Sequence, residues 1–381
     1  MKESLYGELS VIGMHGCEQF VEQVDSYLRE WRRHDGESSF LVEAPCPRFG
    51  TGEGKGMVTH SLRGHDVYII CDVFNYGVTY KMYGQTVPMS PDDHFQDLKR
   101  VLGAIAGKAR RVSVIMPMLY EGRQHKRSSR ESLDCATALQ ELVAMGVTNI
   151  ITFDAHDPRV QNAIPLSGFD NVRPTYQMIK ALVREYPDIS FDKDDMMIIS
   201  PDEGAMQRCM YFSSVLGLDI GMFYKRRDYS RVVNGRNPIV AHEYLGRDLT
   251  GKDAIIVDDM ISSGESLLDV AKQLKEKGAK RIFNFATFGL FTDAFAKFDQ
   301  AYKDGLIDRI FTTNLVYRTP ELLSKPWYVE VNMCKYVAYI IDTLNHDDTI
   351  SSLLDPAKRI HKLVEKHRKA QGGQMKIDFK K

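Results

Sequence analysis

Short apolar runs alternate along the chain with longer stretches in which apolar residues recur every three or four positions. The runs, rich in Val and Ile, predict strands over 8–14, 67–71, 112–116, 149–153, 196–199, 221–224, 254–257 and 281–288. The spaced apolar residues predict helices over 18–31, 97–105, 133–145, 267–274, 337–344 and 358–369, and another from 205 onward. Strands that alternate with helices indicate an α/β fold, with parallel sheets flanked by helices.

The length and the distribution of turn residues predict the domain organisation. A chain of 381 residues is too long for one ordinary core and predicts about two domains. Pro, Ser, Gly and Asn cluster at 165–175, where we place the boundary. The predicted parts are an N-terminal domain over 1–167, a second domain over 168–345, and a C-terminal helix and tail over 346–381. The segment 76–95 has no clear period and predicts a long surface loop.

The composition is that of a globular protein, with 43% hydrophobic and 27% charged residues. A net charge of −1 argues against a nucleic-acid partner, which usually requires a basic excess. The six cysteines have no CxxC spacing and indicate free thiols in a reducing compartment. The sequence lacks both a long apolar run and an apolar N-terminal segment, so we expect no membrane span, no signal peptide and a cytoplasmic location.

The sequence AIIVDDMISSGES at 254–266 joins a predicted strand, two carboxylates, a loop of small residues and an amphipathic helix. The small side chains at 262–264 allow an anion such as phosphate to approach the N–H groups at the start of the helix. Asp258 and Asp259 can accept hydrogen bonds from sugar hydroxyls or hold a cation through water. The structural alternative is that the two aspartates form only a turn and an N-cap.

Five polar segments carry a resemblance to a known family. They are YEGRQHKR at 120–127, FDAHDPRVQ at 153–161, SPDEG at 200–204, YKRR at 224–227 and VDDMISSGES at 257–266. The last resembles the phosphoribosyl diphosphate (PRPP) binding signature of type I phosphoribosyltransferases. The five segments in this order resemble the ribose-phosphate diphosphokinases, also called PRPP synthases or ribose-phosphate pyrophosphokinases, over roughly residues 50–354.

This resemblance implies a fold and a reaction. The fold expected is two similar phosphoribosyltransferase-like (Rossmann-like) domains, with the ATP side in the N-terminal domain and the ribose-phosphate side in the next. The implied enzyme requires Mg²⁺, and the 1-hydroxyl of ribose 5-phosphate attacks the β-phosphorus of ATP to give PRPP and AMP for nucleotide biosynthesis. Members of the family form dimers or larger rings, which implies a homo-oligomer.

The resemblance also assigns roles to individual residues. The catalytic pair is expected to be Lys225 and Arg227, which stabilise charge on the transferred group. ATP is expected to bind at Phe49, Glu53, Arg123, Gln124 and His156. The ribose phosphate is expected to bind at Asp258, Asp259, Ser262, Ser263, Gly264, Glu265 and Ser266. The metal residues implied are His156 and Asp202. On the residues alone, a solvated basic surface explains 123–130 and 225–227 as well, and a lone histidine is more often structural.

One departure from the family pattern leaves alternatives open. The loop here reads Ser-Ser-Gly-Glu-Ser at 262–266, where family members have an acid and a threonine. An inward Glu265 would repel a 5-phosphate by on the order of 1 kcal/mol, whereas an outward one suits the start of a helix. The alternatives are a diphosphokinase that acts on another 5-substituted ribose such as ADP-ribose, and a non-catalytic regulatory homologue.

Overall fold

The computed structural model describes residues 5–32, 39–227 and 239–378, of which 225–227, 239–242 and 372–378 are described by their backbone alone. The chain divides into two compact units. Unit 1 comprises Met1–Pro174, Asn314–Thr319 and Asn332–Asp355. Unit 2 comprises Thr175–Thr313, Pro320–Val331 and Pro356–Lys381.

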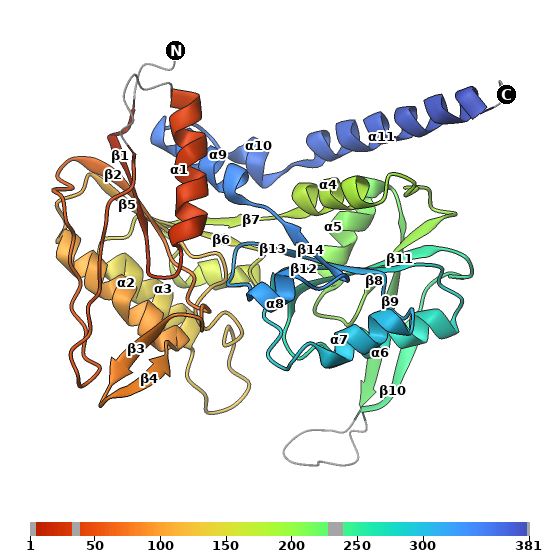
Figure 1. Cartoon of the computed structure of the whole chain (residues 1–381), viewed down its shortest axis with the longest axis horizontal. Coiled ribbons are helices and arrows are strands. Elements are labelled where there is room, and N and C mark those ends of the chain that lie inside the picture. Colours follow the sequence, from red (N-terminus) through yellow and green to blue (C-terminus); the bar gives the residue numbers. More distant parts are fainter. Residues whose placement is uncertain (1–4, 33–38, 228–238, 379–381) are drawn as a thin grey trace. The chain divides into compact units, whose positions relative to one another are not determined.

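Unit 1 contains a five-stranded sheet with the order β1-β2-β5-β6-β7 (Figure 1). Its strands are β1 (Glu8–Gly13), β2 (His65–Ile70), β5 (Arg111–Ile115), β6 (Asn149–Phe153) and β7 (Gly168–Val172). Every neighbouring pair is parallel. The first four strands lie where the apolar runs predict them, whereas β7 has no such run and is held by its register against β6.

Helices cover both faces of this sheet. Those of unit 1 are α1 (Glu18–Arg32), α2 (Pro91–Ile105), α3 (Asp134–Ala144), the 3₁₀ helix η1 (Pro158–Ala163), α9 (Cys334–Asn345) and α10 (Ser351–Leu354). Ile12 of β1 belongs to the core that α2 and α3 cover, while a Cβ on the next residue, Gly13, would touch Val21 of α1. Because successive strand residues point to opposite faces, α1 lies on the face opposite to α2 and α3.

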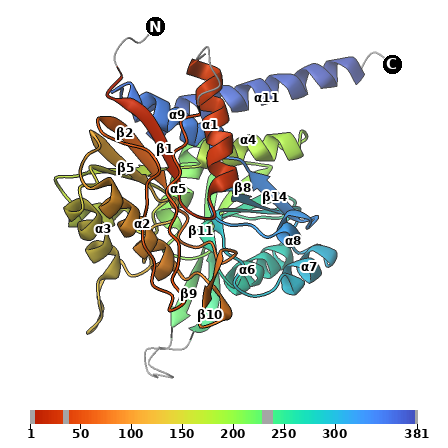
Figure 2. The same cartoon turned by 60° about the vertical axis from the view of Figure 1, so that its left-hand side comes forward.

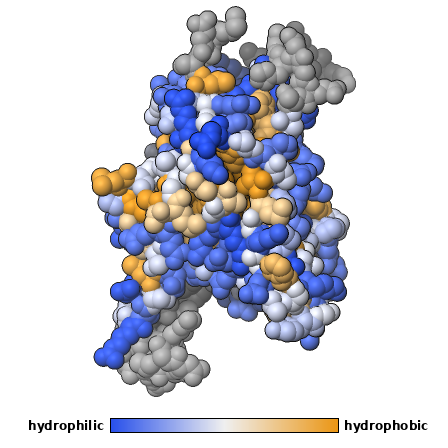
Figure 3. All heavy atoms as spheres, turned by 90° about the vertical axis from the view of Figure 1, so that its left-hand side faces the viewer, coloured by the Kyte–Doolittle hydropathy of each residue, from blue (hydrophilic) through white to orange (hydrophobic). Residues whose placement is uncertain are grey.

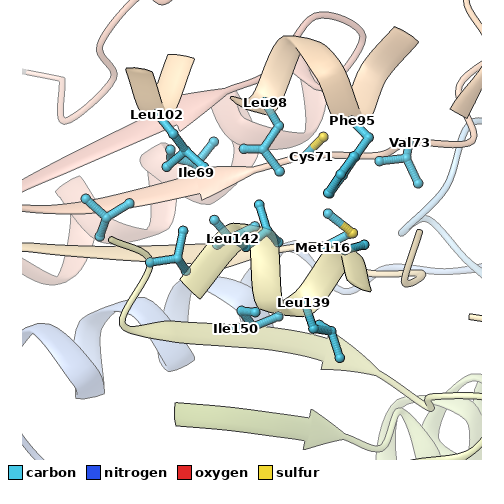
Figure 4. Packing of buried hydrophobic residues seen from close by; sticks show 14 of the residues in the cluster. Ile69, Cys71, Val73, Phe95, Leu98, Leu102, Met116, Leu139, Leu142 and Ile150 are labelled. Carbon is cyan, nitrogen blue, oxygen red and sulfur yellow. The ribbon is translucent and has the colours of Figure 1, made fainter. Parts of the chain in front are cut away.

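The core between the sheet and helices α2 and α3 is built from the apolar faces that the sequence pattern predicts. Figure 4 shows Ile69 of β2 and Cys71, which follows this strand, facing Leu98 of α2, with Leu142 of α3 in the same cluster. Leu98 is fully buried. Burial of such side chains contributes roughly 1.5–3 kcal/mol each, which fixes the sheet and the loops at its carboxyl edge.

The segment 76–95 is not the long loop that the sequence predicts. It contains the hairpin of β3 (Thr79–Met82) and β4 (Gln85–Pro88), followed by the first turn of α2. The two hairpin turn residues, Tyr83 and Gly84, both have positive φ, as a tight primed turn requires. Ser90 starts α2 with a capping box, since it exchanges hydrogen bonds with Asp93.

Unit 2 contains a seven-stranded sheet with the order β10-β9-β8-β11-β12-β13-β14. Its strands are β8 (Met196–Ser200), β9 (Asp219–Arg227), β10 (Ile239–Leu245), β11 (Asp253–Ile261), β12 (Ile282–Gly289), β13 (Arg309–Thr313) and β14 (Tyr328–Val331). All pairs are parallel except β9 with β10. β11 is longer than predicted because Asp258, Met260 and Ile261 continue its register with β12.

The helices of unit 2 are α4 (Thr175–Glu185), α5 (Met206–Leu216), α6 (Glu265–Glu276), α7 (Ala296–Lys303), α8 (Pro320–Leu323) and α11 (Ala357–Asp378). Figure 2 shows the long helix α11 beside α4. The His367 ring lies 2.7 Å from Ile189 O, and Arg368 Nη2 donates to Phe191 O at 2.7 Å. No helix in the described part of the chain has the length and apolar character to cross a membrane.

The domain boundaries predicted from the sequence stay a prediction, and the compact units do not coincide with them. Strand β7 begins at Gly168 and completes the sheet of unit 1, so this unit extends beyond residue 167. Residues 332–345, which the sequence division places in the second domain, belong to unit 1 because α9 packs on α1. Trp31 of α1 stacks on Tyr339 of α9 at a centroid distance of 4.3 Å.

Candidate active site

Two adjacent aspartates lie in the second half of β11 in unit 2. Asp259 is only 4% exposed, and its N–H donates to Asp258 Oδ1 at 2.9 Å. Burial, and then the charge of Asp259, raise the pKa of Asp258 well above its usual value, while the guanidinium of Arg208 on α5 acts in the opposite direction. This pair therefore favours ligands that stabilise its ionised form, such as a cation or sugar hydroxyls.

The loop after β11 leads directly into helix α6. Its backbone is held by Thr292, whose N–H donates to Ser262 O at 3.0 Å. Gly264 is the N-cap of α6 with φ 83°, and a Cβ there would lie 2.1 Å from the ring of Phe298. Because Gly264 has no side chain to cap the helix, the first-turn N–H groups of α6 face the loop, an arrangement that suits an anion. Glu265 and Ser266 are exposed in this first turn.

Asp202 lies at the carboxyl end of β8, the strand next to β11. Its Oδ1 accepts hydrogen bonds from Gly204 N–H at 2.9 Å and from Ala205 N–H at 3.2 Å. The helix after β8 leads to β9 on one side, and the helix after β11 leads to β12 on the other. Neighbouring strands whose connections diverge form a switch point, where open α/β sheets bind ligands. The fold thus brings Asp202 and the 258–266 segment to one such point.

The structure describes only the backbone of the predicted catalytic pair. Lys225 and Arg227 belong to β9, where their backbones pair with His242 and Ile239 of β10. The side chains of both residues lie outside the described residues. Their catalytic role stays a prediction.

In unit 1, His156 follows β6 and is exposed. Its ring lies 5.2 Å from the ring of His125, whose Nδ1 is 3.2 Å from Arg123 O. The predicted residues Arg123 and His156 are therefore joined through His125, which was not among the predicted site residues. Gln124 instead turns back into its own loop and donates to Ser132 O at 2.9 Å.

Two charged residues beside these histidines, Asp157 and Arg159, were not predicted as site residues from the sequence. Asp157 Oδ2 is 3.5 Å from His125 Nε2, and Arg159 donates hydrogen bonds to both carboxylate oxygens of Asp157. These bonds lower the pKa of Asp157 to about 2. The signal was present in the HDPR run that follows β6, where a carboxylate and an arginine stand two residues apart.

Phe49 and Glu53 lie together on a separate tight turn of unit 1. The Phe49 N–H donates to Glu53 O at 2.7 Å, and the Phe49 side chain is 57% exposed. The hairpin β3–β4 supports this turn, since Tyr83 N–H donates to Gly50 O at 2.8 Å. An exposed aromatic ring on a supported turn is available to stack on a flat ligand.

Comparison with known proteins places these features in a family. The model of the N-terminal domain of ribose phosphate pyrophosphokinase matches residues 9–146, and that of the phosphoribosyl synthetase-associated domain matches residues 233–355. The ribose-phosphate pyrophosphokinase of Ureaplasma parvum is 30% identical over 239 residues, which are 62% of this chain and 69% of that protein. The enzyme of Vibrio cholerae is 26% identical over 319 residues, 83% of this chain and 92% of its own length.

A solved structure shares the fold. The phosphoribosylpyrophosphate synthetase of Mycobacterium smegmatis superposes with a TM-score of 0.72 and 20% identity, over 89% of this chain and 99% of that one. Parallel sheets flanked by helices, with a small-residue loop at a switch point, make this chain an α/β protein of the phosphoribosyltransferase-like class. More narrowly, the chain belongs to the ribose-phosphate pyrophosphokinase family and is an enzyme of that family. The fold class and the family resemblance predicted from the sequence are confirmed.

Proposed function

We propose that the protein transfers the diphosphate of ATP to the 1-hydroxyl of ribose 5-phosphate in a reaction that requires Mg²⁺. The products are PRPP and AMP, and the reaction serves nucleotide biosynthesis. The observation that carries the proposal is the segment 258–266, in which two carboxylates and an open helix start meet at a switch point. Family membership supports the same reaction.

The ribose phosphate is proposed to bind with its 2- and 3-hydroxyls on Asp258 and Asp259. Its 5-phosphate is proposed to bind the loop of Ser262, Ser263 and Gly264 and the first turn of α6, with Glu265 and Ser266. Phosphate at a helix start gains from the exposed N–H groups and the helix dipole. The exposure of Glu265 supports an outward side chain, which avoids repulsion of the 5-phosphate.

Mg²⁺ is proposed to bind at Asp202 in unit 2 and near His156 in unit 1. Among the described residues no cluster of three or more His, Cys, Asp or Glu could hold a metal ion. The single carboxylate of Asp202 fits Mg²⁺, because this ion usually takes one or two carboxylates and completes its shell with water and substrate phosphates. When bound, Mg²⁺ would neutralise charge on the ATP phosphates.

The remaining roles concern ATP. Phe49 and Glu53 are proposed to hold the adenine, and Arg123, Gln124 and His156 the phosphates. Lys225 and Arg227 are proposed to neutralise the charge that develops on the transferred diphosphate. A guanidinium is suited to grip phosphate oxygens in pairs, which favours Arg123 for this contact.

The test is AMP formation from ATP and Mg²⁺ by the purified protein, with ribose 5-phosphate, ADP-ribose or no sugar. Turnover chiefly with ribose 5-phosphate, abolished by EDTA, supports the proposal. Turnover chiefly with ADP-ribose would instead favour the alternative substrate, a different 5-substituted ribose, which the departure of the Ser-Ser-Gly-Glu-Ser loop from the family pattern left open. No turnover with either sugar overturns the proposal and favours a regulatory role.

We also propose a homo-oligomer and a cytoplasmic location. Figure 3 shows an apolar band across an otherwise mainly hydrophilic face, and contiguous apolar surface often marks contacts between subunits. All six cysteines are free, which suits a reducing compartment. Analytical ultracentrifugation tests the first proposal, with a species of about 43.4 kDa as the contrary result. Fluorescence microscopy of a tagged chain tests the second.

A further inference from the structure

Residues 120–132 form a basic loop in unit 1, after the carboxyl end of β5. Its exposed cations are Arg123, Lys126, Arg127 and Arg130. The loop is closed on itself by Gln124, whose Nε2 donates to Ser132 O at 2.9 Å and to Glu131 Oε2 at 3.1 Å. These bonds shape the loop, but they do not attach it to the strand next to β5.

His125 reaches out of this loop, and its side chain is only 12% exposed. The ring extends to the segment that follows β6, the strand paired with β5. There, Nε2 lies 3.5 Å from Asp157 Oδ2, and the ring centroid lies 5.2 Å from that of His156. Nδ1 lies 3.2 Å from Arg123 O. Both ring nitrogens therefore lie near acceptor oxygens, which holds the ring in one orientation.

The carboxylate that His125 meets is itself held in place. Asp157 is the N-cap of η1, and its Oδ1 accepts the Arg159 N–H at 2.9 Å. The Arg159 guanidinium donates to both carboxylate oxygens. The Asp157 side chain is 11% exposed, and the bonds from Arg159 lower its pKa to about 2, so it is ionised at neutral pH. His125 thus meets a fixed negative charge that is bonded to the backbone of η1.

We propose that His125 is a positioning residue of the ATP side, which holds Arg123 and His156 in a fixed relation through its contact with Asp157. This inference rests on the proposed function, because Arg123 and His156 are the residues proposed to bind the ATP phosphates. Their segments follow different strands, and His125 joins the two. Because the phosphate-binding groups are then ordered before ATP arrives, less conformational entropy is lost on binding.

His125 acts through its neighbours rather than on ATP itself. Arg123 and His156 are exposed, whereas the His125 side chain is nearly buried beneath them. Loss of His125 should therefore weaken ATP binding by releasing the loop, and a side chain that restores the contact with Asp157 should restore the binding.

The first test compares three variants of His125 in steady-state kinetics. His125→Ala should raise the KM for ATP roughly tenfold, as the loss of groups that orient a binding side chain commonly does. The longer amide of His125→Gln can donate to Asp157 in place of Nε2 and should keep the KM within about twofold of the parent, whereas the shorter His125→Asn should behave as the alanine variant does. The KM for ribose 5-phosphate should stay unchanged in all three, because the proposed sugar site lies in unit 2.

His60→Ala is the matched control. His60 is an exposed histidine of unit 1 whose Nδ1 lies 2.9 Å from Thr59 Oγ1, and its loss should change neither KM. A KM for ATP that is unchanged in His125→Ala, or equal in His125→Gln and His125→Asn, overturns the proposal.

The second test is hydrogen exchange of the full chain without nucleotide or sugar. In His125→Ala the amides of residues 120–132 should exchange at least about fivefold faster than in the parent, while those of β5 and β6 keep their rates. Unchanged exchange in the loop overturns the proposal, and so does faster exchange throughout β5 and β6, which indicates a general loss of structure. This readout needs no turnover, so a parent protein without activity would overturn the proposed function but not the role of His125 in the loop.

Discussion

Arg48 and Asp97 form a bidentate ion pair that ties the Phe49–Glu53 turn to helix α2. The distances are 2.7 Å from Nη1 to Oδ1 and 2.9 Å from Nη2 to Oδ2, and the side chains are only 8% and 4% exposed. Arg100 adds a second cation to Asp97 at 2.6 Å. The Arg48 guanidinium also lies 4.9 Å from the ring centroid of Tyr80 in the hairpin β3–β4.

The first prediction concerns Arg48→Met, which leaves the buried Asp97 with only one cation. Breaking a buried pair usually costs about 3–5 kcal/mol of stability. Because Arg100 remains, we expect the free energy of unfolding measured in urea to fall by about 2–3 kcal/mol. The turn should also loosen, so the KM for ATP should rise severalfold. Arg184→Met is the control, since its pair with Glu185 is exposed, and it should change stability by less than about 1 kcal/mol. An unchanged KM for ATP in Arg48→Met would remove this turn from ATP binding.

The second prediction concerns Gly264→Ala. The new Cβ would meet the Phe298 ring in a backbone conformation with φ 83°, so the loop before α6 must shift. We expect the free energy of unfolding to fall by roughly 2–4 kcal/mol, from overpacking and the left-handed conformation together. The KM for ribose 5-phosphate should rise at least tenfold while the KM for ATP changes little, as measured by steady-state kinetics.

Gly251→Ala is the matched control for this variant. Gly251 also has positive φ, at 76°, but a Cβ there meets nothing within 4 Å. Its cost should be only the conformational one, about 1–2 kcal/mol, with an unchanged KM for ribose 5-phosphate. Equal KM values for the two variants would show that the close packing of Gly264 does not serve the sugar site.

How much could be read from the sequence depends on how local the signal is. Eight strands of the two sheets follow from apolar runs because buried parallel strands are apolar on both faces, whereas β10, β13 and β14 are not predicted from the sequence. The hairpin at 79–88 is missed because its turn uses Tyr83 and Gly84, and tyrosine rarely adopts positive φ. β7 is missed because Gly168–Val172 contains Gly, Asp and Asn, which are typical of turns. This composition is tolerated because the strand is mostly half-buried.

Prediction of the candidate sites also depends on how local their sequence signal is. The loop at 258–266 is contiguous, so its motif can be identified from the sequence. His125 comes close to His156 and Asp157 only after β5 and β6 pair, so this contact comes from the fold rather than from spacing. A cavity of about 570 Å³ in unit 1 likewise joins residues 15–20 with 314–318, a separation that no local pattern spans. Long-range juxtaposition, rather than residue type, sets the limit of the sequence analysis.

The third prediction is a pH dependence at the aspartate pair. The pKa of Asp258 is raised by burial and by Asp259, so the pair holds a proton at pH values where an exposed carboxyl is ionised. Binding of a cation or of sugar hydroxyls favours the ionised form. We therefore expect kcat/KM for ribose 5-phosphate to increase with pH through this raised pKa. Asp258→Asn should lose most of the activity, by about 10²-fold or more, and the rising limb with it.

Asp269→Asn serves as its control. Asp269 is an exposed carboxylate on α6 of the same unit, and its loss should leave the pH profile unchanged. A rising limb that survives in Asp258→Asn at the same pH would assign that limb to another group.

The last prediction is a stability effect of Asp72 in the wall of the unit 1 cavity. Burial raises its pKa from 3.8 to about 6, against the lowering effect of the Phe74 and Tyr317 N–H groups. Between these two values the folded state binds more protons than the unfolded state, so this group makes the protein more stable as pH falls from about 6 to about 4. The shift corresponds to roughly 3 kcal/mol at most.

Other carboxylates act in the opposite direction at acidic pH, so the effect is measured as a difference from Asp72→Asn. Urea unfolding of both proteins between pH 4 and pH 8 should give the parent protein a relative gain of about 1–3 kcal/mol toward the acidic end. The amide cannot ionise, and it still accepts a hydrogen bond from one of the two N–H groups. Parallel stability curves for the two proteins would mean that the Asp72 carboxyl is not desolvated, and the cavity would then be open to water at this wall.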